Sequence, residues 1–281
     1  MKVAVIGATG ALGRHVIPRL VERGHQVRAI VRKPAQVEWF QRMGVEAVQG
    51  DILEADTLLP ATVACEAALH IATAIPKPGG AADWSLNDRI RREGTRNFLA
   101  ACQVNTVRRY VQQSITLLYS EQGKTIVDES TPIQPDSITL SAADMEEIVE
   151  QANLDWCILR GGLFYGPGTG RQDEWRQAVQ AGKLQYPGDG SSLISLLNVV
   201  DMARAIIVSV ERADARTVYN IVDDQPVDYR SLYGYLAAQA GIPKPQPGGE
   251  VVLPSLGCSN ERIKAELGWE PMYPTYRSGL A

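Results

Sequence analysis

Three glycines near the N-terminus have the spacing of a phosphate-binding turn. Gly7, Gly10 and Gly13 follow the short apolar run Val3–Ile6 and precede a segment with helical periodicity. The first glycine permits a tight turn, the second lets backbone amides approach a pyrophosphate, and the third lets the helix lie close to the strand. Unlike an ordinary glycine-rich turn, this one occupies the junction of a strand and a helix, where N–H groups favour anionic oxygens. We expect a dinucleotide to contact Gly7, Thr9, Gly10, Ala11, Leu12 and Gly13.

Two cations follow the second expected strand, Val27–Val31. In nucleotide-binding α/β domains an acid at this point accepts hydrogen bonds from the ribose of NAD, whereas an arginine suits the extra phosphate of NADP. Here the strand is followed by Arg32 and Lys33, and Arg14 could flank the same phosphate. The pattern predicts NADP as the cofactor. NAD is the alternative if the two cations are only solvated loop residues.

An alternation of short β-branched runs with helical segments must position these residues. It predicts parallel βαβ units with right-handed crossovers, and so an α/β fold with a doubly wound parallel sheet of the Rossmann type. Pro18 lies inside the first helical segment and predicts a kink or local loosening rather than a break. Strands are expected at Val3–Ile6, Val27–Val31, Ala47–Val48, Ala67–Ile71, Tyr110–Val111 and Trp156–Leu159, and helices at Leu12–Arg23, Arg89–Cys102 and Ala142–Ala152.

After Gly166 the composition changes, because proline and glycine become frequent and the expected strands become short. We interpret residues 1–165 as the Rossmann domain and 166–281 as a smaller, interleaved C-terminal cap that binds substrate. The strand Val218–Val222 is expected to rejoin the main sheet, so that 196–224 returns to the first domain. Helices of the cap are expected near Glu174–Ala181, Ser231–Ala240 and Asn260–Leu267.

Composition limits the classes of function. With 21% charged residues and a net charge of -4, the chain offers no basic face for a nucleic-acid backbone. The apolar run before Gly7 is too short for a signal peptide or a membrane span, so we expect a cytoplasmic protein without a membrane partner. The four cysteines are far apart in sequence and predict neither a metal site nor a redox pair.

The chain resembles the extended and atypical short-chain dehydrogenase/reductases, the epimerase/dehydratase-like families. The resemblance implies that Asp51 and Ile52 line the adenine and that Ala72, Thr73 and Ala74 pass beneath the ribose and nicotinamide. The segments that carry it run from end to end of the chain: Gly7–Gly10, Gly50–Asp51, Leu69–Ala72, Gly94–Asn97, Leu159–Gly168, Asn198–Ala203 and Glu266–Pro271.

The usual catalytic residues of this family are missing. Its members transfer hydride with a tyrosine and a lysine four residues apart on one helix face, where the lysine lowers the pKa of the tyrosine. The matching positions here are Ser137 and Ser141, and Ile115 stands at the usual strand hydroxyl position between Ser114 and Thr116. Serine has no acidic proton near neutral pH and cannot carry a positive charge, so the two serines cannot perform these roles unaided.

Other titratable residues near the expected cleft offer few alternatives. By resemblance Tyr165 faces the nicotinamide and serves either as a wall or as a proton donor, so we name it with Ser137 and Ser141 as a candidate catalytic residue. His70 at a strand end is more typical of a packed residue than of a chemical one. Tyr119 and Asp144 are interpreted as structural and solvated, respectively.

Three hypotheses follow for the function. The leading one is an NADP-binding, atypical reductase that acts on a small organic substrate with a proton relay outside the usual triad. The alternatives are a non-catalytic dinucleotide sensor or scaffold, and a non-redox lyase or isomerase on the same fold. The expected partner is a small-molecule substrate or ligand. Whether the protein forms a homodimer is left open.

Overall fold

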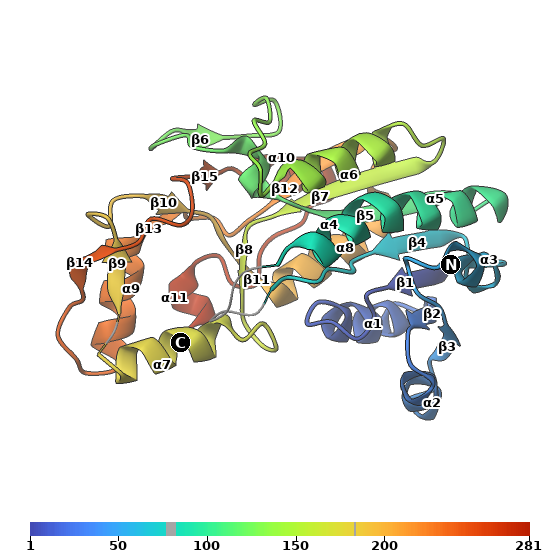
Figure 1. Cartoon of the computed structure of the whole chain (residues 1–281), viewed down its shortest axis with the longest axis horizontal. Coiled ribbons are helices and arrows are strands. Elements are labelled where there is room, and N and C mark those ends of the chain that lie inside the picture. The colour runs from blue at the N-terminus through green and yellow to red at the C-terminus, as the bar shows by residue number, and fades with distance from the viewer. Residues whose placement is uncertain (77–82, 183) are drawn as a thin grey trace. The chain divides into compact units, whose positions relative to one another are not determined.

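A computed structural model describes residues 1–76, 83–182 and 184–281. The chain divides into two compact units. Unit 1 comprises Met1–Ser114, Asp136–Leu159 and Ala203–Val218, and unit 2 comprises Ile115–Pro135, Arg160–Met202 and Tyr219–Ala281. Figure 1 shows the succession of elements by colour along the chain.

A seven-stranded parallel sheet forms the centre of the fold, in the order β12-β7-β5-β4-β1-β2-β3. From β1 the chain builds outward through β2 and β3, then returns to place β4 on the other side of β1. In open parallel sheets ligands bind at the carboxyl ends of the strands where the strand order reverses. Gly7 directly follows β1 at this point. The strands are β1 Lys2–Ile6, β2 Gln26–Val31, β3 Glu46–Gln49, β4 Ala67–His70, β5 Arg109–Ile115, β7 Asp155–Gly161 and β12 Thr217–Ile221.

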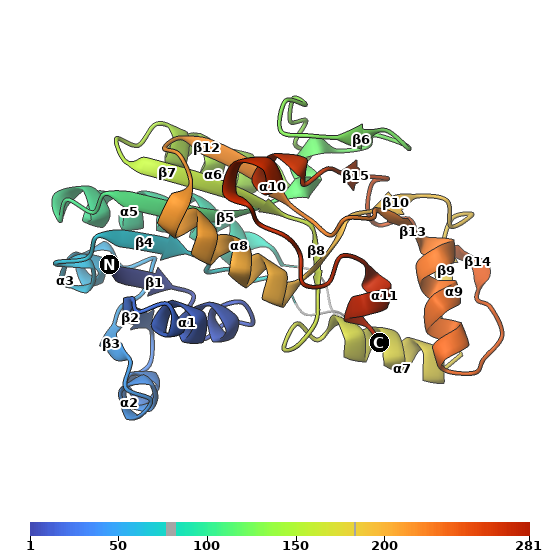
Figure 2. The same cartoon turned by 180° about the vertical axis from the view of Figure 1, so that it is seen from behind.

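Helices of unit 1 cover both faces of the sheet. Helices α4, α5 and α6 lie in front of the sheet in Figure 1, and α1 and α8 lie in front of it when the molecule is turned in Figure 2. α1 continues unbroken across Pro18. The helices are α1 Gly13–Glu22, α2 Pro34–Arg42, α3 Ala55–Thr62, α4 Ser85–Arg89, the π-helix Ile90–Gly94, α5 Thr95–Val104, α6 Leu140–Glu150 and α8 Val199–Arg212.

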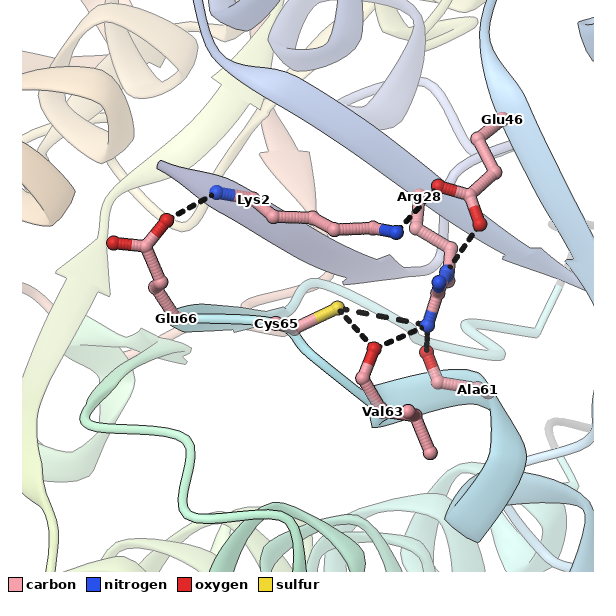
Figure 3. A network of polar contacts seen from close by, with 7 residues as sticks. All are labelled: Lys2, Arg28, Glu46, Ala61, Val63, Cys65 and Glu66. Atoms are coloured by element: carbon pink, nitrogen blue, oxygen red, sulfur yellow. Dashed lines mark hydrogen bonds and ion pairs between the residues drawn. The ribbon is translucent and has the colours of Figure 1, made fainter.

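A polar network closes the end of the sheet away from the glycine turn (Figure 3). Arg28 is only 8% exposed, yet its guanidinium is well satisfied. It donates to the Glu46 carboxylate at 2.8 Å and to the carbonyl oxygens of Val63 at 2.7 Å and Ala61 at 3.3 Å. The Lys2 ammonium lies 2.9 Å from the other oxygen of Glu46. A buried arginine in unit 1 is thus neutralised and hydrogen-bonded, as burial of a charge requires.

Unit 2 has its own aromatic core, which includes Tyr165, Trp175, Tyr229 and Tyr276. Short strand pairs and helices surround it. The strands are β6 Ile126–Val127, β8 Leu163–Tyr165, β9 Gln185–Pro187, β10 Leu193–Ile194, β11 Leu196–Asn198, β13 Val227–Asp228, β14 Gln246–Gly249 and β15 Gly257–Cys258. The helices are the 3-10 turn Thr116–Tyr119, α7 Arg171–Gln180, α9 Tyr229–Gln239, α10 Glu261–Leu267 and α11 Tyr276–Gly279.

The predicted fold class is confirmed, and each expected strand and helix has a counterpart in the structure. The strand expected at Val218–Val222 is β12 and joins the main sheet beside β7. The single helix predicted at Arg89–Cys102 is instead a succession of α4, a π-helix and α5. Among the described residues, no helix combines the length and apolar character needed to cross a bilayer.

Candidate functional site

The glycine turn leaves no space for side chains at two of its three glycines. A Cβ on Gly7 would lie 2.6 Å from the backbone nitrogen of Ala72, and the φ of Gly7 is +92°. A Cβ on Gly13 would lie 2.6 Å from the carbonyl carbon of Ala8. Gly10 is different, because its Cβ would meet only the Gly7 carbonyl oxygen at 3.3 Å. Gly7 and Gly13 are therefore needed for the close approach of β1, β4 and α1, whereas Gly10 stands free on the rim of the turn.

The rim of the turn is open to a ligand. Thr9 and Gly10 are exposed and Ala11 is half-buried, while Leu12 is buried beneath them. The Gly10 amide donates to the Gly7 carbonyl at 3.0 Å, which fixes the turn. No described side chain caps the start of α1. The amides of Arg14, His15 and Val16 donate to backbone carbonyls, so in the described structure the amides left for an anion are those of Ala11, Leu12 and Gly13. The turn therefore offers exposed backbone and amide donors of the kind that bind an anion.

Arg32 and Lys33 lie exposed at the carboxyl end of β2. Within the described ranges neither side chain forms an ion pair, and the same holds for Arg14 at the start of α1. The Lys33 amide donates to Gln36 at 3.1 Å as α2 begins. The three cations therefore remain available for a phosphate.

Asp51 and Ile52 lie in the turn between β3 and α3. The Asp51 carboxylate accepts the Leu53 amide at 3.0 Å and is half-buried. Ile52 is buried, and Asn97 donates to its carbonyl at 3.0 Å. The adenine contact that the resemblance implies for Asp51 and Ile52 stays a prediction.

The segment after β4 is held by a buried asparagine. The Ala74 amide donates to Asn87 Oδ1 at 3.0 Å. Ala72 and Ala74 are half-buried and Thr73 is exposed. Asn87 is fully buried, and its side-chain nitrogen has no partner among the described residues. Sequence reasoning missed this residue.

Ser137 and Ser141 do not share a helix face. Ser137 is exposed in a turn, because the Asp136 carboxylate accepts the amides of Ile138 and Thr139 and delays the helix until Leu140. Ser141 is buried in the first turn of α6, where its hydroxyl accepts a 3.1 Å hydrogen bond from Arg91. The two serines were expected on one helix, at the positions of the tyrosine and the lysine. This expectation is wrong, because only Ser141 lies in α6.

His70 is buried and held in its neutral form. Its Nδ1 lies 2.7 Å from the Gln112 side-chain oxygen, and its ring packs against Phe98. Burial lowers the pKa of His70 to about 4. A histidine that stays neutral at physiological pH and has no exposed surface is a packed residue, so the chemical role considered for it gains no support.

The tyrosines of unit 2 are enclosed. Tyr165 is 0% exposed, and burial raises the pKa of its hydroxyl while the Asn198 side chain lowers it. A Cβ on Gly279 would fall within 2.6 Å of the Tyr165 ring, so the C-terminal helix α11 packs directly on it. Tyr165 thus serves as core in unit 2, and its predicted proton donation gains no support from this position. Tyr119 donates to Asn220 at 2.9 Å and accepts from Arg160, a structural arrangement.

Two further residues in unit 1 were missed. Arg91 is only 8% exposed and donates to Ser141. Glu146 is 2% exposed and accepts a 2.5 Å hydrogen bond from Ser114. Both lie on the buried faces of their helices at positions where apolar residues are the rule. A charge on the apolar stripe of a helical pattern was the signal that could have identified them.

The sheet topology and the glycine cradle define a dinucleotide-binding α/β protein. The chain belongs to the NAD(P)H-binding family, whose pattern matches residues 7–186. The resemblance to the extended and atypical short-chain dehydrogenase/reductases is confirmed.

The similar proteins include reductases. A 3-diazoavenalumate denitrifying reductase of a Streptomyces species is 30% identical, over 100% of this chain and 99% of that protein. A 2-alkyl-3-oxoalkanoate reductase of Stenotrophomonas maltophilia is 30% identical, over 87% of this chain and 77% of that protein.

Solved structures share the fold. A dTDP-glucose 4,6-dehydratase of Streptomyces venezuelae with bound NAD superposes with a TM-score of 0.87 at 22% identity, covering 100% of this chain and 95% of that one. A UDP-glucose 4-epimerase of Thermus thermophilus with NAD gives a TM-score of 0.82 at 24% identity, covering 100% and 96%. At these identities the likeness concerns the fold alone.

Proposed function

We propose that the protein is an NADP(H)-dependent reductase that acts on a small organic anion without a tyrosine–lysine pair. The observation that carries the proposal is the glycine turn, where Gly7 and Gly13 exclude any side chain while Gly10 and the amides from Ala11 to Gly13 remain open in the described structure. A turn with only a structural role would not need its rim free and uncapped. The reductases among the similar proteins support the same class of reaction.

The choice of NADP rests on charge. The adenosine ribose of a dinucleotide seated on the glycine turn lies near the end of β2, where Arg32 and Lys33 are exposed and have no acidic partner in the described structure. A planar guanidinium matches a phosphate well. An NAD-selective site would instead offer a carboxylate there.

The nicotinamide, when bound, supplies the hydride. The chain's own residues hold the dinucleotide on the turn, line the adenine at Asp51 and Ile52, and fix the segment of Ala74 through Asn87. Ser137 and Ser141 offer no proton of suitable acidity, and His70 is neutral and buried. Water therefore has to supply any proton that the substrate requires.

The lack of a protein acid favours a substrate group that can accept hydride without also needing a proton. A carbonyl needs a proton on its oxygen as hydride arrives. A diazonium group needs none, because R–N₂⁺ and hydride give R–H and N₂ with charge and atoms balanced. One similar protein is named as a denitrifying reductase of a diazo compound, and both reductases above are named for organic anions. We therefore propose an acidic substrate whose reduction does not depend on a protein acid.

The test is hydride transfer from deuterated cofactor. Wild-type protein is incubated with NADPH carrying deuterium at C4 and with two aromatic acids, one bearing a diazonium group and one a ketone. We expect deuterium in the product of the diazonium acid, at a rate well above the protein-free control. Equal rates with and without protein for both acids, despite tight NADPH binding, would contradict the reductase and favour the dinucleotide sensor.

A further inference from the structure

Arg91 lies on the buried face of a helical segment, and the other residues of this face are uncharged. The buried stripe of this segment runs through Asn87, Ile90, Arg91, Gly94 and Thr95. Arg91 is its single charged member, and it sits in the π-helix Ile90–Gly94. π-helical turns inside α-helices are frequent at functional sites. The neighbouring cations Arg89 and Arg92 are different, because each is paired with an acid, Glu93 and Asp144 respectively.

Comparison with Arg28 shows what Arg91 lacks. Each arginine is 8% exposed. Arg28 has a carboxylate and two carbonyl oxygens as partners (Figure 3). In the described part of the chain, Arg91 has one partner, the neutral hydroxyl of Ser141, and no ion pair. A guanidinium carries five N–H donors, so most of those of Arg91 are left for another acceptor.

The immediate surroundings of Arg91 do not neutralise it. Burial lowers the pKa of Arg91, Asp88 raises it and Arg92 lowers it further. Asp88 is itself 3.9 Å from Arg92. A buried charge without a counter-ion is strongly unfavourable. An anion that is not part of the described chain would lower this cost.

A neighbour of Arg91 contacts the segment Ala72–Ala74, which is expected to lie beneath the ribose and nicotinamide. Asn87, four residues earlier on the same stripe, holds the Ala74 amide at 3.0 Å, and its side-chain nitrogen has no partner among the residues that the structure describes. Ser141 starts the helix on which the family carries its catalytic pair. All of these residues belong to unit 1.

We propose that Arg91, supported by Ser141, binds the carboxylate of the substrate. A carboxylate is planar and accepts both arms of a guanidinium fork. This assignment rests on the proposed reductase function and adds the substrate class and its anchoring residue. The phosphates of the dinucleotide are the alternative anions for Arg91. They are already assigned to the glycine turn and to Arg32 and Lys33 after β2.

The first test needs no substrate. Arg91→Met removes the charge and keeps most of the volume, and Arg89→Met is the matched control, an exposed arginine two residues earlier in the chain. We expect Arg91→Met to unfold at the same or a higher temperature than wild type, because it removes an uncompensated buried charge. A loss of several degrees that exceeds that of Arg89→Met would assign Arg91 to structure and overturn the proposal.

The second test measures anion preference in the complex with NADP⁺. The probes are 3-oxooctanoate and 4-hydroxycinnamate, each compared with its methyl ester by calorimetry. We expect wild type to bind at least one acid roughly tenfold or more tightly than its ester, Arg91→Met to lose this preference, and Arg91→Lys to keep part of it. Absence of the preference in wild type, or its persistence in Arg91→Met, would refute the proposal.

The cofactor itself provides the remaining control. Unchanged NADPH affinity in Arg91→Met supports a substrate role. A fall in NADPH affinity with an unchanged acid-to-ester ratio would assign Arg91 to the dinucleotide and overturn the proposal, while leaving the reductase function intact. Failure of wild type to bind NADPH would defeat the reductase function, and the acid-to-ester comparison on the free protein would still test Arg91.

Discussion

Gly7 and Ala72 approach so closely that a Cβ on the glycine would lie 2.6 Å from the alanine nitrogen. This contact joins the ends of β1 and β4, the two strands at the reversal of the sheet order. It separates the roles of the three glycines, because Gly7 and Gly13 serve the fold while Gly10 has room beside it.

Gly10→Val should abolish dinucleotide binding and leave the fold intact. The φ of Gly10 is not in the left-handed region, and its Cβ would meet only one backbone atom at 3.3 Å. The valine side chain would fill the space through which a pyrophosphate approaches. Calorimetric titration with NADPH, together with thermal unfolding, checks both parts. Gly13→Ala is the contrasting variant, for which we expect lowered thermal stability. Normal NADPH binding by folded Gly10→Val would show that the turn is not the cofactor site.

Arg32→Asp should weaken NADPH binding by roughly tenfold or more and reduce the preference over NADH, because a charge-assisted phosphate contact is lost and a repulsive carboxylate is introduced. Titration of both cofactors against wild type and variant measures the change. Arg42→Asp, an exposed arginine near the end of α2, controls for net charge. Equal affinities of wild type for the two cofactors would refute the NADP assignment.

Wild type should show little carbonyl reduction, and restoring the two family residues alone should not correct this. A positioned general acid contributes about 10²–10⁴-fold to such reactions. In Ser137→Tyr/Ser141→Lys the new ammonium would lie beside the Arg91 guanidinium, now 3.1 Å from Ser141. Ser137 also lies in the turn before α6, off the helix that carries Ser141, so we expect no gain of ketone reduction from the double variant. Nicotinamide absorbance with a panel of ketones measures it, and efficient turnover by wild type would reveal another proton relay.

Asp223→Asn should stabilise unit 2 at neutral and higher pH. Burial raises the pKa of the Asp223 carboxyl to about 8, and one of its oxygens has no partner among the described residues. Between about pH 4 and 8 the folded protein keeps a proton that the unfolded chain has lost, so wild-type stability falls as pH rises through this window. The asparagine has no such proton. Melting temperatures should therefore diverge in its favour between pH 5 and pH 8, and parallel curves would contradict the shifted pKa.

Local sequence determined much of this protein. Short β-branched runs alternate with helical periodicity, and this is sufficient to predict a parallel sheet and to place Gly7 between a strand and a helix. The residues of the glycine turn follow from the same reasoning, because a phosphate turn is built from neighbours in the chain, whereas the roles expected of Asp51, Ile52 and Ala72–Ala74 came from the family resemblance. Arg32 and Lys33 could be identified because they directly follow a strand.

Tertiary structure decided which side chains meet. Arg91 and Ser141 are fifty residues apart and become hydrogen-bonded only when α6 packs against the π-helix. Tyr165 was expected to face the nicotinamide, but it ends β8 as a fully buried residue on which α11 packs. Asp136 delays α6 and separates Ser137 from Ser141. Periodicity indicates which face of an element is buried, whereas the partner on that face depends on packing between segments distant in sequence. The role of a buried charge depends on that partner, so sequence alone could not assign it.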